Sequence, residues 1–178
     1  MGIVEKLKTE FDLEEEWVPY ELHSDTPAEG VEIVEKFPDL SLEKLRAGLN
    51  SKGEQYGVSF GNFSRISNSS MALQIGELAK EKGCYGQFHE KIFEAYFRDA
   101  LDIGNLDVVL DVATSSGLER EVTLEALNSG RFLDRLEQAR VEVSELGITA
   151  APTFIINGQT KMVGALPYVR FVKALTGN

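Results

Sequence analysis

The ten residues TAAPTFIING, at positions 149–158, decide the fold of this chain. They place Pro152 at the start of a β-branched and aromatic segment that ends at an Asn-Gly pair. A proline is tolerated at the first residue of a strand because its missing N–H costs no interior ladder bond. Asn-Gly supplies the positive φ angles of a two-residue hairpin turn. The sequence therefore predicts a hairpin whose second strand covers residues 159–165, followed by a helix over residues 168–175.

The first forty residues are predicted to add a helix and a strand. Apolar residues at helical spacing indicate a short amphipathic helix over residues 2–11. Residues 13–22, around Trp17, have the β-branched and aromatic composition of a strand. Pro19 and the three glutamates at 14–16 place that strand at a sheet edge, where a lost N–H and charge are acceptable.

Between these two parts the hydrophobic pattern is almost wholly helical. Its period changes from two to 3.6 near residue 40 and returns to two near residue 148. We therefore predict an α/β domain formed by residues 1–40 and 148–178, interrupted by a helical insertion of residues 41–147. In the α/β domain the Trp17 strand and the Phe154 strand are expected to share one sheet.

Composition excludes several classes of partner. The net charge is −11, and clustered Lys and Arg are absent, so neither nucleic acid nor an anionic membrane surface is an expected partner. No stretch approaches the ~20 apolar residues of a membrane-spanning helix. The N-terminal MGIVEKL is typical of a helix start, so no signal peptide is expected. A single cysteine, Cys84, suits a reducing compartment, and the expected location is the cytoplasm.

The order of proline, hairpin and final helix resembles the C-terminal half of a thioredoxin fold. A helical block between the two halves of that fold resembles the DsbA family of thiol–disulfide oxidoreductases, and particular motifs resemble its FrnE-like branch. These motifs are WVPYELH at 17–23, DTPAEG at 25–30, AKEKG at 79–83, FHE at 88–90, DIG at 102–104, SGRF at 129–132, LGIT at 146–149 and APTF at 151–154. The resemblance covers essentially the whole chain and implies a thioredoxin-like fold with an all-helical insertion.

The resemblance also implies where a ligand would bind. In this family a loop with a cis proline exposes its backbone to an extended substrate, which is a form of strand addition. It therefore implies a cis Ala151–Pro152 bond and a substrate-binding role for Ala151, Pro152 and Thr153. The implied partner is an extended peptide or a protein thiol substrate. No cofactor is expected, and two distant histidines do not have the spacing of a metal site.

One departure from the family pattern changes the expected chemistry. Members of the branch begin with a strand that is followed by Cys-Pro-Trp-Cys at the N-terminus of the first long helix. This sequence shows no counterpart of that strand or of either cysteine, so its thioredoxin-like domain is expected to lack the first strand. Cys84 lies near a helix start in the middle of the chain and is expected to be structural. No catalytic residue is predicted, and the chain is expected to be redox-inactive.

Three functions remain open from the sequence. The chain can be a DsbA-like oxidoreductase by descent, represented without its active-site strand. It can instead be a non-catalytic peptide-binding or assembly module, in which a second copy pairs with an exposed strand edge to form a homodimer. A third, less favoured possibility is a relative of the glutathione-dependent isomerases, whose serine site would also have no counterpart here.

Overall fold

The computed structural model describes residues 2–177, which form two compact units. Unit 1 contains residues 1–22 and 139–178, and unit 2 contains residues 23–138. Helix α8, Leu133–Glu145, begins in unit 2 and ends in unit 1.

These boundaries differ from the predicted ones at residues 40 and 147. The physical reason is a short antiparallel ladder in which β1, Val31–Glu32, pairs with β2, Arg65–Ile66. Hydrogen bonds of this ladder tie the segment after residue 22 to the helical unit. The segment predicted to be an all-helical insertion therefore contains one short strand, β2, whose partner β1 precedes that segment.

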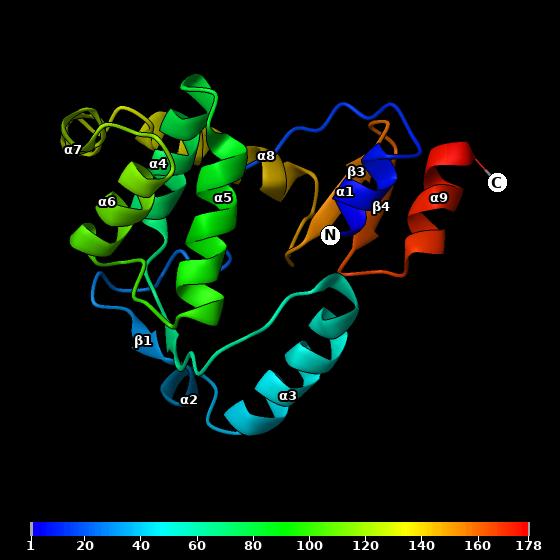
Figure 1. The fold of residues 1–178 in the computed structure, drawn as a ribbon, viewed down its shortest axis with the longest axis horizontal. Helices are drawn as coiled ribbons and strands as arrows, with labels where there is room; N and C mark the ends of the chain where they lie inside the picture. The colour runs from blue at the N-terminus through cyan, green and yellow to red at the C-terminus, as the bar shows by residue number, and fades with distance from the viewer. Residues whose placement is uncertain (1, 178) are drawn as a thin grey trace. The chain divides into compact units, whose positions relative to one another are not determined.

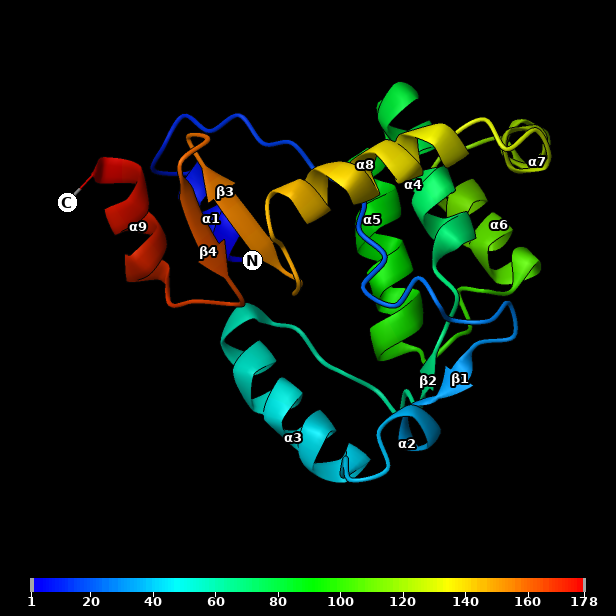
Figure 2. The same ribbon diagram turned by 180° about the vertical axis from the view of Figure 1, so that it is seen from behind.

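Unit 1 is built on the predicted hairpin and the two terminal helices. Its elements are α1 (Ile3–Lys8), the end of α8, β3 (Thr153–Ile156), β4 (Thr160–Val163) and α9 (Tyr168–Thr176). Both α1 and α9 lie beside the hairpin in the two opposite views (Figure 1, Figure 2). Leu7 of α1, Met162 of β4 and Phe171 of α9 are buried in one shared core. The ring of Phe154 meets that of Phe171 edge-on, with 4.9 Å between centroids.

The hairpin has the turn residues that the sequence predicts but a longer loop. Asn157 (φ 52°) and Gly158 (φ 67°) both adopt the left-handed conformation that Asn-Gly favours. The N–H of Gln159 donates to the carbonyl of Ile156 at 3.1 Å. Ile156 pairs with Thr160, so three residues connect the strands and the predicted two-residue loop is wrong by one residue.

The predicted strand around Trp17 is wrong. Residues 12–21 have no regular secondary structure, and Trp17 does not share a sheet with Phe154. A strand exists only where another strand satisfies its backbone groups, and within residues 2–177 β3 pairs with β4 alone. Without a ladder partner, local β propensity does not suffice against Pro19 and three adjacent glutamates.

Unit 2 is a bundle whose centre is α4, Ser70–Glu81. Leu78 and Ala79 of this helix are completely buried, and α4 contacts α5, α6 and α7. The other helices of the unit are α2 (Ile33–Lys36), α3 (Leu42–Gly53), a 3₁₀ turn (Glu54–Tyr56), α5 (Tyr85–Phe93), a π-helical turn (Glu94–Arg98), α6 (Leu106–Ser115) and α7 (Arg120–Asn128). The helical character predicted for this region is confirmed.

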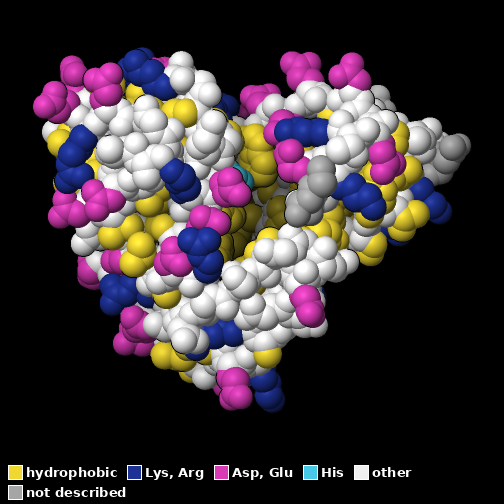
Figure 3. Space-filling view, viewed as in Figure 1, with side chains coloured by type: hydrophobic (Ala, Val, Ile, Leu, Met, Phe, Trp, Pro, Cys, Tyr) yellow, Lys and Arg dark blue, Asp and Glu magenta, His cyan; other side chains and the backbone are white. Residues whose placement is uncertain are grey.

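The exposed surface is mixed in charge. On the face seen in Figure 3, acidic side chains and basic side chains are interspersed rather than gathered by sign. Over residues 2–177, none of the helices is both long enough and apolar enough to cross a membrane.

Candidate functional site

The candidate site is the loop of residues 146–152, which connects α8 to β3, together with Thr153, the first residue of β3. The end of α8 is closed by Gly147, whose φ of 59° lies in the left-handed region. The N–H of Gly147 donates to Ser144 O and the N–H of Ile148 donates to Val143 O, both at 3.0 Å. This pair of bonds is the Schellman motif, which glycine favours because it has no Cβ. It ends the helix at a defined residue and sets the direction in which the loop leaves.

A lysine from the hairpin binds the carbonyl groups at the C-terminal end of α8. Lys161 of β4 donates from Nζ to the carbonyl oxygens of Leu146 at 3.0 Å and Gly147 at 3.3 Å. A cation is favourable there because the last carbonyls of a helix carry partial negative charge. The contact fastens the loop to the strand that pairs with β3.

The proline itself is fixed by two hydrogen bonds. The Ala151–Pro152 peptide bond is cis. The N–H of Gly164 donates to the carbonyl of Pro152 at 2.7 Å, and the Thr153 hydroxyl donates to the carbonyl of Ala150 at 2.7 Å. Thr153 therefore uses its hydroxyl to close the loop.

The exposed residues of the loop include backbone groups that form no hydrogen bond with any described residue. Ala151 and Pro152 are both exposed. Within the described residues, neither the N–H nor the carbonyl of Ala151 has a hydrogen-bond partner. Exposed, unpaired backbone next to a strand is the feature that an extended ligand can use.

The open backbone continues along β3. In an antiparallel pair, opposed residues alternate between hydrogen-bonded and non-hydrogen-bonded positions. Because Pro152 and Gly164 are a bonded pair, the bonded positions of β3 are Phe154 and Ile156. Thr153 and Ile155 therefore direct their N–H and carbonyl groups to the opposite edge, where no described segment pairs with them.

The side chains of the hairpin also divide between two faces. Phe154 and Ile156 pack toward the core with Met162. On the other face, Ile155 is 39% exposed and Val163 is 50% exposed. An extended chain added at the edge of β3 would thus meet unpaired backbone and an apolar surface together.

The remaining candidate residues lie in unit 2. Cys84 is half-buried at the N-cap of α5, and it packs against the core of that unit. The His23 ring is tilted against that of Phe37, with 6.0 Å between centroids, and the His89 and Phe93 centroids are 4.5 Å apart. In residues 2–177 no group of His, Cys, Asp or Glu has the arrangement of a metal site. Each of these residues is part of the packing of unit 2.

Two contributors to the site could not be found from the sequence. Lys161 and Gly164 reach the loop only through the hairpin register, and a lysine or glycine near a turn has many other uses. The candidate site is thus a loop with a cis proline, carried by a hairpin between two helices. That combination defines a protein of the thioredoxin-like class.

Comparison with known proteins identifies the family. The model of the DSBA-like thioredoxin domain matches residues 3–176, so this chain belongs to that family. The uncharacterized protein YwbO of Bacillus subtilis is 30% identical over 169 residues, which are 93% of this chain and 82% of YwbO.

A solved structure supports the same fold. The probable DsbA oxidoreductase of Streptomyces coelicolor superposes with a TM-score of 0.79. The match has 23% sequence identity and covers 89% of this chain and 72% of the other. The predicted DsbA-like thioredoxin fold is thereby confirmed.

Proposed function

We propose that this chain is a peptide-binding domain of the FrnE-like branch of the DsbA family. Its ligand is an extended segment of another polypeptide, bound at Ala151, Pro152 and Thr153. We further propose that these 178 residues do not catalyse dithiol–disulfide exchange by themselves.

The unpaired backbone of the proline loop carries the first part of the proposal. Ala151, Thr153 and Ile155 together offer a continuous row of backbone donors and acceptors on the free edge of β3. An added strand forms hydrogen bonds with such groups through its own backbone. These bonds form whatever side chains the ligand carries. A protein thiol substrate in an extended conformation belongs to this class of ligand.

The number of cysteines supports the second part of the proposal, that the chain does not catalyse dithiol–disulfide exchange by itself. Exchange proceeds through a mixed disulfide that a second thiol must resolve. The chain has one cysteine, Cys84, which is half-buried in unit 2, whereas Pro152 belongs to unit 1. A single cysteine also fits a reducing compartment, and we place the chain in the cytoplasm on that ground.

Peptide binding can be tested at the edge of β3. Ile155→Pro removes one outward N–H, and a proline is tolerated where the missing N–H faces away from the ladder. We expect S-alkylated, fluorescein-labelled insulin B chain to bind about two- to tenfold more weakly, because one hydrogen bond contributes about 0.5–1.5 kcal/mol. Fluorescence anisotropy measures the change.

The matched control is Ile155→Val, which keeps both the N–H and the β-branched shape. It should bind as the unchanged chain does. Equal affinity of the proline and valine variants would mean that β3 does not pair with the ligand.

The redox part predicts no turnover. The purified chain should not accelerate the reduction of insulin by dithiothreitol above the uncatalysed rate. A Cys84→Ser variant should behave identically, since the proposal assigns no chemistry to that thiol. Turnover that disappears in Cys84→Ser would refute the proposal.

A second copy of the chain is the competing occupant of the same edge. The segment TFII of β3 carries no charge, and an uncharged free edge readily pairs with another strand. Antiparallel pairing of two β3 strands would give a homodimer. Sedimentation velocity should then show a dimer that Ile155→Pro dissociates, and a monomer at all concentrations removes this alternative.

Family membership favours one other function, disulfide oxidoreduction with thiols from polypeptide outside these 178 residues. The coding DNA upstream of the first codon tests it directly. An in-frame strand followed by Cys-Pro-x-Cys would support the oxidoreductase over the binding domain.

A further inference from the structure

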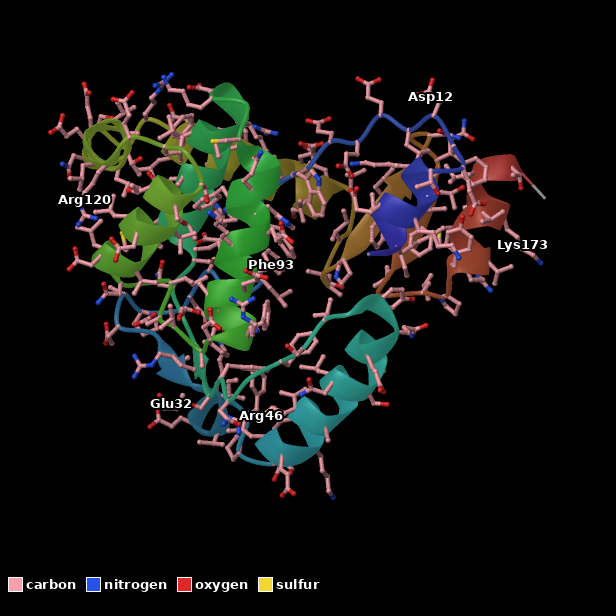
Figure 4. All side chains as sticks on the ribbon, in the orientation of Figure 1. Asp12, Glu32, Arg46, Phe93, Arg120 and Lys173 are labelled. Carbon is pink, nitrogen blue, oxygen red and sulfur yellow. The ribbon has the colours of Figure 1, made fainter. Side chains whose placement is uncertain are left out.

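Unit 2 contains a polar cavity that the proline loop does not use. It has a volume of about 160 Å³ and lies where β1, β2 and the π-helical turn meet. Its lining includes Glu32, Arg65, Ser67, Tyr96, Ala100 and Asp102. Figure 4 labels Glu32 on β1 and Arg46 on α3, and the Arg46 guanidinium donates to the carbonyls of Asn62 and Phe63 in the cavity wall.

A buried hydroxyl in this wall has no partner. Ser67 is only 7% exposed, and its Oγ makes no hydrogen bond within the described structure. A buried hydroxyl without a partner is costly, and such groups usually find one in a bound molecule or in water. Ser67 Oγ is therefore available as a hydrogen-bond partner for a molecule that enters the cavity.

The backbone opposite Ser67 departs from regular helix geometry at two points. The turn Glu94–Arg98 is π-helical, and Ala100 has a φ of 56°, in the left-handed region. Both features are uncommon and occur often at functional sites. Together they bring Tyr96, Ala100 and Leu101 to the cavity.

Tyr96 connects the π-helical turn to β2 across the cavity. Its hydroxyl donates to the Arg65 carbonyl at 2.7 Å. Burial raises the pKa of Tyr96, and the negative charge of Asp102 adds to the rise. The hydrogen bond therefore holds the π-helical turn against β2 at the cavity.

The charges of the cavity do not balance. Arg65 pairs with Glu32 at 3.3 Å and also donates to the Glu29 carbonyl. Asp102 accepts from the Gly104 N–H at 2.9 Å, but no cation among residues 2–177 pairs with it. The lining therefore contains one carboxylate without a paired cation and one hydroxyl without a partner.

We propose that this cavity binds a small primary ammonium group through the Asp102 carboxylate and Ser67 Oγ. An ammonium has three donors and no acceptor, which matches a carboxylate and a hydroxyl that accept. Charge-assisted bonds of this kind are stronger than neutral ones. A cavity of about 150 Å³ holds benzene, so the ligand has about six non-hydrogen atoms or is the end of a lysine side chain.

The experiment uses the ¹⁵N-labelled full chain and two ammonium probes. Ethanolamine hydrochloride represents a free small amine, and Nα-acetyl-lysine amide represents a lysine side chain. We expect saturable chemical-shift changes at the amides of Ser67 and Gly104 with at least one of them. The probe that binds more tightly identifies the source, while sodium chloride at the same ionic strength should produce no saturable change.

Variants test the two assigned groups. Asp102→Asn keeps an oxygen for the Gly104 N–H, so the loop is retained, and it should weaken binding about tenfold. Ser67→Ala should weaken binding about threefold. Asp134→Asn makes the same charge change on α8 outside the cavity and should leave the affinity unchanged.

Three results would overturn the proposal. The first is the absence of saturable shifts with either ammonium probe. The second is equal binding of a neutral alcohol such as 1-propanol, which would exclude a charged ligand. The third is equal loss in the Asp102 and Asp134 variants, which would assign the effect to net charge.

Discussion

The partial burial of Glu21 disfavours the charged form of its carboxyl. Partial burial raises the pKa of its carboxyl, and the positive charge of Arg140 offsets part of the rise. A raised pKa means that the folded chain holds this proton more tightly than the unfolded chain does. The protonated Glu21 carboxyl therefore stabilises the folded chain fully when the pH is below the pKa of the unfolded chain. This contribution to the free energy of unfolding is lost as the pH rises through the pKa of the folded chain.

Glu21→Gln removes this dependence because glutamine does not titrate. We expect the variant to be slightly more stable than the unchanged chain at pH 7 and no more stable near pH 4. The effect is small because solvent screens a group that is still largely accessible. Urea unfolding at both pH values measures it, and a variant that loses stability at pH 7 would show that the Arg140 contact outweighs burial.

Several single residues were readable from the sequence because their chemistry is local. Asn105 caps α6 by accepting from the N–H groups of Asp107 and Val108, at 2.9 and 3.3 Å. Gly147 closes α8 in the left-handed conformation that glycine favours after a helix. Each of these roles depends only on neighbours within a few residues, so composition and spacing suffice. Ser67 gave no such signal, since a cavity forms only when distant segments meet.

At the scale of elements, the hairpin was predictable and the Trp17 strand was not. The hairpin contains both of its strands and its own turn, so its hydrogen bonds are satisfied within about a dozen residues. A strand at residues 13–22 would depend on a partner that the local sequence does not contain. The three-residue loop also depends on register, which neighbouring residues alone do not fix.

Lys161 links two elements, and its removal should loosen the proline loop. Lys161→Met eliminates the donors to Leu146 and Gly147 and removes a cation from the C-terminal end of α8. We expect a loss of about 0.5–1 kcal/mol in the free energy of unfolding and faster hydrogen exchange at Ile148. Urea unfolding and amide exchange measure the two effects.

Lys44→Met is the matched control, because that lysine side chain is exposed at the start of α3 and forms no hydrogen bond or ion pair with any described residue. It should leave exchange at Ile148 unchanged. The same acceleration in both variants would mean that overall charge, and not the contact, controls the loop.

The whole chain has two cores made of separate residues. Phe171 is 2% exposed in the core of unit 1, and Leu78 is completely buried in the core of unit 2. The chain has a single tryptophan, Trp17, which belongs to unit 1. Tryptophan fluorescence therefore reports on unit 1, whereas far-UV circular dichroism is dominated by the helices of unit 2.

Alanine substitutions should separate these two signals. Phe171→Ala should cost unit 1 about 3–5 kcal/mol and lower the fluorescence midpoint in urea more than the dichroism midpoint. Leu78→Ala should cost unit 2 about 2–5 kcal/mol and lower the dichroism midpoint more. The control is Val169→Ala, since Val169 is 55% exposed and its truncation should change little. Coincident midpoints in both core variants would mean that the two units unfold as one.

The division of the molecule gives it a natural pair of labelling positions. The only tryptophan is in unit 1 and the only cysteine is in unit 2. An acceptor dye attached to Cys84 would receive resonance energy from Trp17 without any engineered residue. The efficiency of that transfer would measure the separation of the two units in solution, and its change on adding insulin B chain would reveal whether they move when the ligand binds.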